Sequence, residues 1–247
     1  MIGYNVEKIN ELAEMLINNY KTIGEKMAEG WPNLSSTMEK EWVGPDEVSY
    51  EKELATNICK LYESCTETVV QMVQNIDILG QNWVEFQKNN ILTSGNSVST
   101  DPSVAGGQTI EPKAPSLQPY DIASQVKAGS PTFAAGTNMG LTNGTQSGTN
   151  IKTVFDSYID GVYTSVQGLY MNIDASQAFL GSELSAKVSE YLATVGEALA
   201  KLTTCHKSIY DALDQLIAAY ATHETDEAAN ISSAAGEEID FNGQNLK

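Results

Sequence analysis

Apolar residues recur in steps of three and four along four separate segments of this chain, and this spacing constrains the fold more than any other feature. The first segment runs from Val6 to Met27 and the second from Leu54 to Phe86. The pattern returns between Phe155 and Ile173, and again between Leu184 and His223. Such steps place the apolar residues on one face of a helix. Each segment therefore predicts an amphipathic helix that needs partner helices to cover it.

The first two segments predict a helical hairpin within residues 1–90. The stretch Gly30-Trp31-Pro32 predicts a break or kink in its leading helix, and the turn falls at Trp42-Val43-Gly44. Gly44 can supply the unusual backbone angles of a helix-to-helix turn, and Pro45 suits the first turn of the next helix. The acidic pair that follows, Asp46 and Glu47, is favourably placed at the positive end of that helix.

The remaining two segments predict a second hairpin within residues 151–224. Between the hairpins, residues 91–150 lose all periodicity and fill with Gly, Ser, Thr, Asn and Pro. This composition predicts a long flexible linker, with short ordered pieces around Tyr120 and Phe133. Residues 225–247 are acidic and polar and predict a disordered tail.

Charge and composition exclude several function classes. The chain has 14 lysines and no arginine against 32 acidic residues, for a formal charge of -18. This balance disfavours nucleic acid and anionic membrane surfaces as partners. The first fifteen residues lack the basic and apolar regions of a secretory signal, and no apolar run is long enough to span a membrane. We therefore expect neither a signal peptide nor a membrane-spanning helix.

The supply of residues for catalysis is thin. His206 falls on the apolar stripe, where a packed histidine is the simpler interpretation. No glycine-rich phosphate loop and no metal-ligand spacing is present, and three scattered cysteines are too few for a disulfide framework. We expect no enzymatic activity, no cofactor and no metal.

The two hairpins align with each other at an offset of 137 positions, which is the distance from Trp42 to Phe179. At this offset Phe179-Leu180-Gly181 lies on Trp42-Val43-Gly44, and Glu224 lies on Gln87. Tyr220 lies on Trp83. A chance match of helical stripes need not align the turn and a helix end together. The chain therefore indicates a diverged internal duplication.

A hairpin of about ninety residues with Trp-x-Gly at its bend resembles the WXG family, the early-secreted-antigen-like substrates of type VII secretion systems. Residues 1–90 resemble one member, and residues 151–224 resemble a second whose bend carries Phe179 and Gly181. The family's companion export signal, Tyr-x-x-x-Asp/Glu, is matched by Tyr220 and Glu224. Members are usually separate chains without a break in the first helix, so this chain departs from the family as a fusion and at Gly30-Trp31-Pro32.

The resemblance implies an all-α fold in which two hairpins pack as an antiparallel four-helix bundle. It also implies an export signal composed of Trp42, Gly44, Tyr220 and Glu224, recognised by the secretion ATPase or a channel component. Other WXG-like proteins are further candidate partners. The chain would fold in the cytoplasm and be exported in folded form, with its two halves forming an intramolecular pseudo-heterodimer.

The sequence allows more than one interpretation of Trp42 and of the function of the chain. Trp42 suits either an exposed aromatic anchor for a partner or a buried cap on the hydrophobic seam. The whole chain suits, besides a type VII substrate or component, a secreted helical effector acting on a host protein or membrane. A third interpretation is an intracellular coiled-coil scaffold whose Trp-x-Gly is coincidental.

Overall fold

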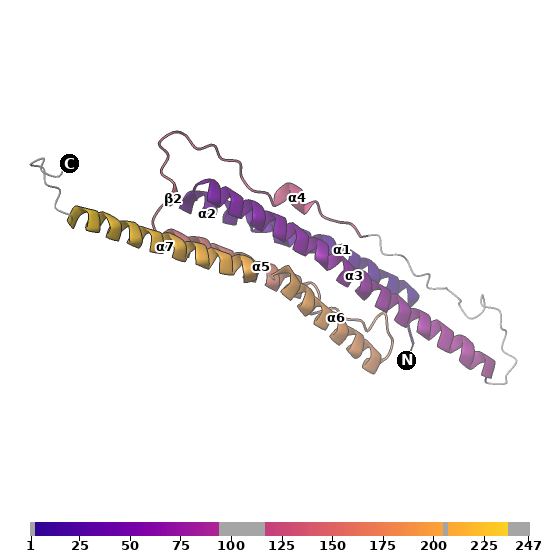
Figure 1. Cartoon of the computed structure of the whole chain (residues 1–247). Coiled ribbons are helices and arrows are strands. Elements are labelled where there is room, and N and C mark those ends of the chain that lie inside the picture. Colours follow the sequence, from indigo (N-terminus) through magenta and orange to yellow (C-terminus); the bar gives the residue numbers. More distant parts are fainter. Residues whose placement is uncertain (1–2, 94–116, 205–206, 237–247) are drawn as a thin grey trace, which may run out of the picture. The chain divides into compact units, whose positions relative to one another are not determined.

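The computed structural model describes residues 3–93, 117–204 and 207–236, and these are mostly helical (Figure 1). The expected predominance of helix is confirmed. In the described part of the chain, no helix is both long and apolar enough to cross a membrane. The elements are α1 (Val6–Glu29), α2 (Trp31–Glu41), β1 (Trp42–Val43), α3 (Pro45–Thr93), α4 (Ile122–Gln125), β2 (Gly140–Leu141), α5 (Thr145–Gly168), α6 (Ser182–Thr203) and α7 (Lys207–Gly236).

The described parts of the expected linker and tail carry more regular structure than the sequence indicated. The short helix α4 and the strand β2 lie within residues 91–150, and α5 begins at Thr145. Buried Ile122 and Val126 anchor the segment around α4. Helix α7 continues to Gly236, through alanine-rich sequence with good helix propensity. Residues 94–116 of the expected linker and 237–247 of the expected tail lie outside the described residues.

Contacts divide the chain into two compact units, each assembled from three stretches. The first unit comprises Met1–Pro32, Glu53–Lys127 and Ser157–Cys205. The second unit comprises Asn33–Lys52, Ala128–Asp156 and His206–Lys247. Each unit therefore combines residues from both expected hairpins.

The core of the first unit is built from the apolar stripes that the sequence predicts. Tyr20 stacks on Tyr62 with ring centroids 4.7 Å apart, and its hydroxyl lies 2.7 Å from Oγ1 of Thr66. Burying this face removes apolar surface from water, which is the main stabilising term for such helices. The buried stripe residues of the unit include Ile9, Leu16, Ile23, Met27, Leu54, Ile58, Cys65, Val69, Met72, Ile76, Val162, Val166, Val188 and Leu199.

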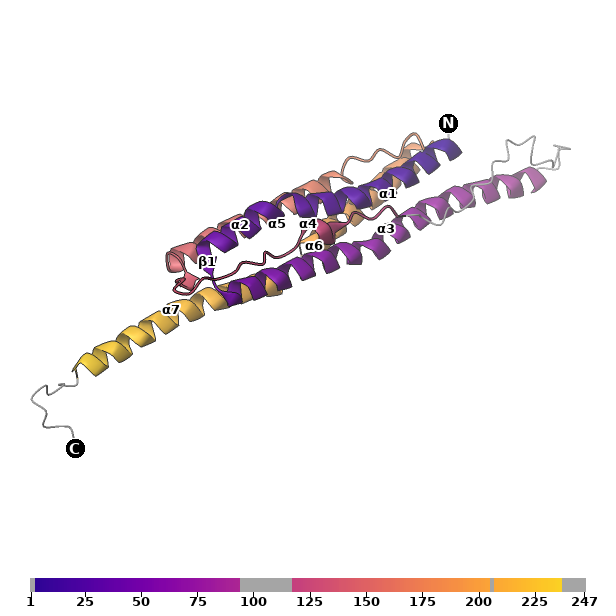
Figure 2. The ribbon, with the colours of Figure 1, turned by 90° about the horizontal axis from the view of Figure 1, so that it is seen from above.

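The segment around α4 covers α1 and α3 within this unit, as Figures 1 and 2 both show. The backbone N–H of Tyr120 donates to the hydroxyl of Tyr62 at 2.8 Å. The indole N–H of Trp31 donates to the carbonyl of Lys127 at 3.0 Å. Since α1 ends at Glu29 and α2 begins at Trp31, the predicted helix break is confirmed and has a role: it presents Trp31 to the covering segment.

The two halves of the sequence also meet within the first unit. Phe179 is fully buried and forms an isolated antiparallel bridge with Tyr4. Backbone hydrogen bonds in both directions join Gly3 and Leu180, at 3.1 and 2.8 Å. Gly181 then forms the N-cap of α6. The second bend is thus fastened to the beginning of the chain.

The buried face of α6 includes Val188 and Leu199 of the predicted stripe but differs from the stripe between them. Tyr191 and Val195, which continue the helical spacing of the stripe predicted between Leu184 and His223, are half-buried, whereas the structure buries Leu192 and Gly196. The reason is close packing on Tyr170. A Cβ on Gly196 would lie 2.2 Å from Cβ of Tyr170, so only glycine admits this approach.

We predict that Gly196→Ala lowers the free energy of unfolding by about 1–3 kcal/mol, because the added methyl overpacks a core that cannot easily yield. Thermal or urea unfolding followed by circular dichroism measures the change. Gly161→Ala is the matched control, since nothing lies within 4 Å of its added methyl. That variant should gain about 0.5–1 kcal/mol from lower backbone entropy in the unfolded chain. Equal effects of the two changes would contradict the packing argument.

Candidate functional site

The expected turn of the first hairpin lies in the second unit and contains a strand that the sequence did not indicate. Strand β1 pairs antiparallel with β2, with Trp42 opposite Leu141 and Val43 opposite Gly140. Helix α3 begins directly after Gly44, at Pro45, as proposed for this residue pair. The two-stranded ribbon fixes the direction in which the Trp42 side chain leaves the backbone.

Asp46 joins Trp42 to Tyr220. Its Oδ2 accepts a hydrogen bond from the indole N–H of Trp42 at 3.2 Å and another from the Tyr220 hydroxyl. The indole nitrogen also lies 3.3 Å from the Tyr220 hydroxyl oxygen, and the two rings meet edge to face with centroids 6.3 Å apart. The structure thereby brings together two of the candidate signal residues, which are 178 positions apart in sequence.

Gly44 makes room for this arrangement. Its φ is +157°, and a Cβ at this position would lie 2.5 Å from Oδ1 of Asp46. The absence of a side chain therefore allows the Asp46 carboxylate to turn back toward Trp42. Gly44 therefore has two roles: it adopts a backbone conformation that other residues rarely adopt, and it leaves room for the Asp46 carboxylate.

Trp42 is 1% exposed, so of the two interpretations left open for it the exposed aromatic anchor is wrong and burial is confirmed. Its ring packs against Tyr50, with centroids 5.7 Å apart, as well as against Tyr220. A large amphipathic ring is well suited to such a place because its apolar body is buried while its N–H finds an acceptor.

Tyr220 and Glu224 line one cavity of about 270 Å³, together with Gly140 of the ribbon and Met139 just before it. Glu224 is exposed, and Met139 is 57% exposed. Tyr220 is half-buried, and burial together with its hydrogen bond to Asp46 raises the pKa of its hydroxyl. The phenol therefore stays protonated and keeps donating to Asp46 at physiological pH. Glu224 lies one helical turn further along α7, on the same face as Tyr220.

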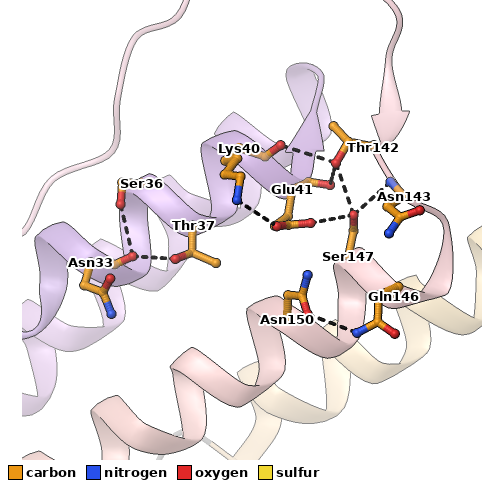
Figure 3. A network of polar contacts seen from close by, with 10 residues as sticks. All are labelled: Asn33, Ser36, Thr37, Lys40, Glu41, Thr142, Asn143, Gln146, Ser147 and Asn150. Carbon is orange, nitrogen blue, oxygen red and sulfur yellow. Dashed lines mark hydrogen bonds and ion pairs between the residues drawn. The ribbon is translucent and has the colours of Figure 1, made fainter.

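A network of polar side chains holds β2 and α5 on the end of α2 (Figure 3). Ser147 donates through Oγ to Oε2 of Glu41 at 2.8 Å, and its oxygen accepts from the backbone N–H of Asn143 at 2.9 Å. The backbone N–H of Thr142 donates to the carbonyl of Glu41 at 2.9 Å. The bond from Ser147 holds the pKa of the buried Glu41 carboxyl below its ordinary value.

Helix α7, which contains Tyr220, packs against α5. A Cβ on Gly148 would lie 2.7 Å from Cδ1 of Ile217, so the two helices approach closely at this glycine. Lys152 and Asp214 form an ion pair at 2.6 Å beside it. Close packing at Gly148 and the ion pair therefore help to place Tyr220, beside its contacts with Asp46 and Trp42.

Sequence reasoning missed three residues of this site: Glu41, Asp46 and Ser147. Asp46 was given only the general role of an acidic residue at a helix start. Its position four residues after Trp42 could have predicted this contact. A helix that starts at Pro45 places its first carboxylate near the preceding turn. Neither Glu41 nor Ser147 stands in any pattern that marks a partner about a hundred residues away.

We predict that Asp46 and Tyr220 are energetically coupled by about 1.5–3 kcal/mol, the usual range for a hydrogen bond to a charged group. A double-mutant cycle of Asp46→Ala and Tyr220→Phe, measured by urea unfolding, gives this coupling energy. As a control, Asp46→Ala combined with Tyr191→Phe in the other unit should be additive to within about 0.5 kcal/mol. Additive effects of Asp46→Ala and Tyr220→Phe would rule out the shared bond.

We predict that Ser147→Ala costs about 1–3 kcal/mol of stability at neutral pH, because the Glu41 carboxylate loses a buried donor. A lowered carboxyl pKa stabilises the folded state above the unfolded pKa and loses this effect as pH falls through the folded one. The difference between Ser147→Ala and the parent should therefore shrink below about pH 4. Thr149→Ala, on the exposed side of the same helix, is the control and should show no such pH dependence.

Comparison with known proteins gives no support from relatives. No protein family model, curated protein or solved structure matches this chain. Its function must therefore be argued from its own residues, of which the cluster of Trp42, Asp46 and Tyr220 is the most informative group.

Proposed function

We propose that this chain is a non-enzymatic substrate or component of a type VII, ESX-like secretion system, built as a fused pair of WXG-like hairpins. In this proposal residues 1–90 and 151–224 pack as an antiparallel four-helix bundle joined by a long linker. The chain folds in the cytoplasm and is exported in folded form. The secretion ATPase or a channel component recognises a signal made from both halves.

The observation that carries the proposal is the direct contact between the bend motif and the tyrosine motif. Trp42 belongs to the Trp-x-Gly bend and Tyr220 to Tyr-x-x-x-Glu, and both bind the carboxylate of Asp46. Neither motif alone is specific, since both recur by chance. Their meeting at one carboxylate is a much stronger argument for a single signal.

Two contacts support the antiparallel arrangement. The second bend, at Phe179, pairs with Tyr4 near the start of the first hairpin. The first bend, at Trp42, contacts Tyr220 near the end of the second hairpin. In each contact the bend of one hairpin meets the open end of the other, as antiparallel packing requires. Joining the halves in one chain also replaces dimerisation by an intramolecular step at high effective concentration.

The burial of Trp42 refines the proposed role of each signal residue. The indole positions Tyr220, and Gly44 allows Asp46 to complete the bond. Tyr220 and Glu224 line a cavity on the exposed side of this cluster. The partner therefore contacts chiefly Glu224 and the accessible edge of Tyr220, while Trp42 and Gly44 act from beneath.

We predict that Glu224→Gln lowers the amount of chain in the culture medium of its native host at least about tenfold, the effect of losing about 1.4 kcal/mol of binding free energy. Because Glu224 is exposed, the unfolding temperature of the purified variant should stay that of the parent. Immunodetection in medium and cell fractions measures export. Deleting the secretion ATPase should abolish export of the parent chain.

Asp226→Asn is the matched control, because it removes the same charge from an exposed side chain two residues further along α7. Its export should equal that of the parent. Normal export of Glu224→Gln, or export that persists without the ATPase, would refute the proposal. An equal loss in both variants would mean that general charge, and not the motif, governs export.

A further inference from the structure

A second cavity of the second unit, of about 540 Å³, has acidic and apolar walls. Its apolar wall is formed by Trp42, Val43, Pro131 and Phe133, and its acidic wall by Glu39 and Glu47. This volume lies within the range of roughly 300–1,000 Å³ that is usual for ligand sites. This cavity shares no lining residue with the cavity at Tyr220 and Glu224. Both cavities lie against the same two-stranded ribbon, the first against β1 and the other against β2.

Two acidic side chains of α3, of which Glu47 lines this cavity, are buried with one carboxylate oxygen each left unpaired. Glu47 is 2% exposed and Glu51 is fully buried, and Oε1 of each has no hydrogen-bond partner among the described residues. Burial of an unpaired carboxylate is costly, and folded proteins normally pair such groups. Burial raises the pKa of Glu47 to about 7, helped by the nearby charges of Glu51, Glu39 and Asp46. At neutral pH the group is therefore partly ionised, and among the described residues the charges that act on it are all acidic.

Glu39 and Glu51 also converge on the backbone of Gly129. The backbone N–H of Gly129 donates to Oε2 of Glu51 at 2.8 Å. A Cβ on Gly129 would lie 2.2 Å from Oε1 of Glu39 and 3.7 Å from Oε2 of Glu51. The absence of a side chain at Gly129 thus leaves room for both acidic side chains. This convergence adds negative charge beside the cavity, which Glu39 lines.

The missing group is a cation that also has apolar surface. The described residues that line the cavity include no lysine, and the chain contains no arginine. In the described part of the chain, no group of three or more His, Cys, Asp or Glu residues is arranged to hold a metal ion. An aliphatic stem fits the wall of Val43, Pro131 and Phe133, and a planar cation suits two carboxylates beside aromatic rings.

We propose that this cavity receives an arginine side chain of a partner protein, with its guanidinium between Glu39 and Glu47 and its methylenes against Phe133. Guanidinium is favoured over ammonium because it donates in a fork to carboxylates and stacks on aromatic faces. The net charge of -18 attracts basic partners over a long range and so assists the encounter. This inference does not depend on the proposed role in secretion.

The test uses N-acetyl-arginine amide as the probe and N-acetyl-citrulline amide as its uncharged counterpart of the same shape. Nuclear magnetic resonance of the full chain follows the indole N–H signal of Trp42, which lines the cavity. We expect saturable shifts with the arginine amide at millimolar concentrations and none with citrulline. The affinity should fall as pH drops from about 8 to about 6, because Glu47 takes up a proton.

Three variants separate binding from folding. Glu47→Gln should abolish the response to the arginine amide while raising the unfolding temperature, because it removes a buried unpaired charge. Glu53→Gln, an exposed change on the same helix, should alter neither property. Glu39→Gln should weaken binding severalfold, since Glu39 lines the cavity as well.

Several outcomes would overturn the proposal. These are an equal response to the citrulline amide, no response to the arginine amide at millimolar concentrations, or full binding by Glu47→Gln. Stronger displacement of the Trp42 signal by Ca²⁺ or Mg²⁺ than by the arginine amide would assign the cavity to a metal cation instead. Export of the chain is measured separately, so a failure here leaves the secretion proposal to its own test.

Discussion

The carboxylate of Asp46 is the shared acceptor on which the arrangement of the candidate site depends. It binds Trp42 four residues before it and Tyr220 174 residues after it, so one side chain closes both a local turn and a distant contact. The neighbouring features serve this contact. Gly44 leaves the space for the carboxylate, and the bonds that Glu41 accepts from Thr142 and Ser147 hold the second strand of the ribbon beside Trp42. Charge-assisted bonds of this kind are among the stronger ones in proteins.

Periodicity predicted much of the fold because it depends on a local rule. An amphipathic helix must repeat its apolar face about every 3.6 residues, so the stripes of α1 and α3 could be identified without knowing what covers them. The helix break at Gly30 and the start of α3 at Pro45 follow from equally local stereochemistry. The prediction missed two buried positions of α6, Leu192 and Gly196. The close contact with Tyr170 is possible there because Gly196 has no side chain. No hydrophobic pattern reports such a residue.

The site could be predicted only in part, for a related reason. Motif spacing pointed to Trp42, Gly44 and Tyr220, but the partners that hold them are polar residues with no periodic signature. Ser147 stands in a stretch whose composition indicates a linker, and its bond to Glu41 spans 106 positions. Acidic residues pose the same difficulty. In a chain with 32 of them the natural expectation is a solvated face, whereas Glu47 and Glu51 are buried. Burial depends on what packs on top, which local sequence does not state.

The burial of Trp42 changes how a bend of this kind could be recognised. A tryptophan that is 1% exposed offers a partner almost no surface. It can therefore affect partner binding only by positioning the residues around it. Its N–H fixes Asp46 and Tyr220 on one side, while its ring forms part of the wall of the acidic cavity on another. Replacing it by a smaller residue would therefore disturb both cavities at once, although neither ligand would touch much of it. A loss of partner binding in such a variant would measure positioning, and only changes at exposed Glu224 or at Glu39 and Glu47 would separate the two surfaces.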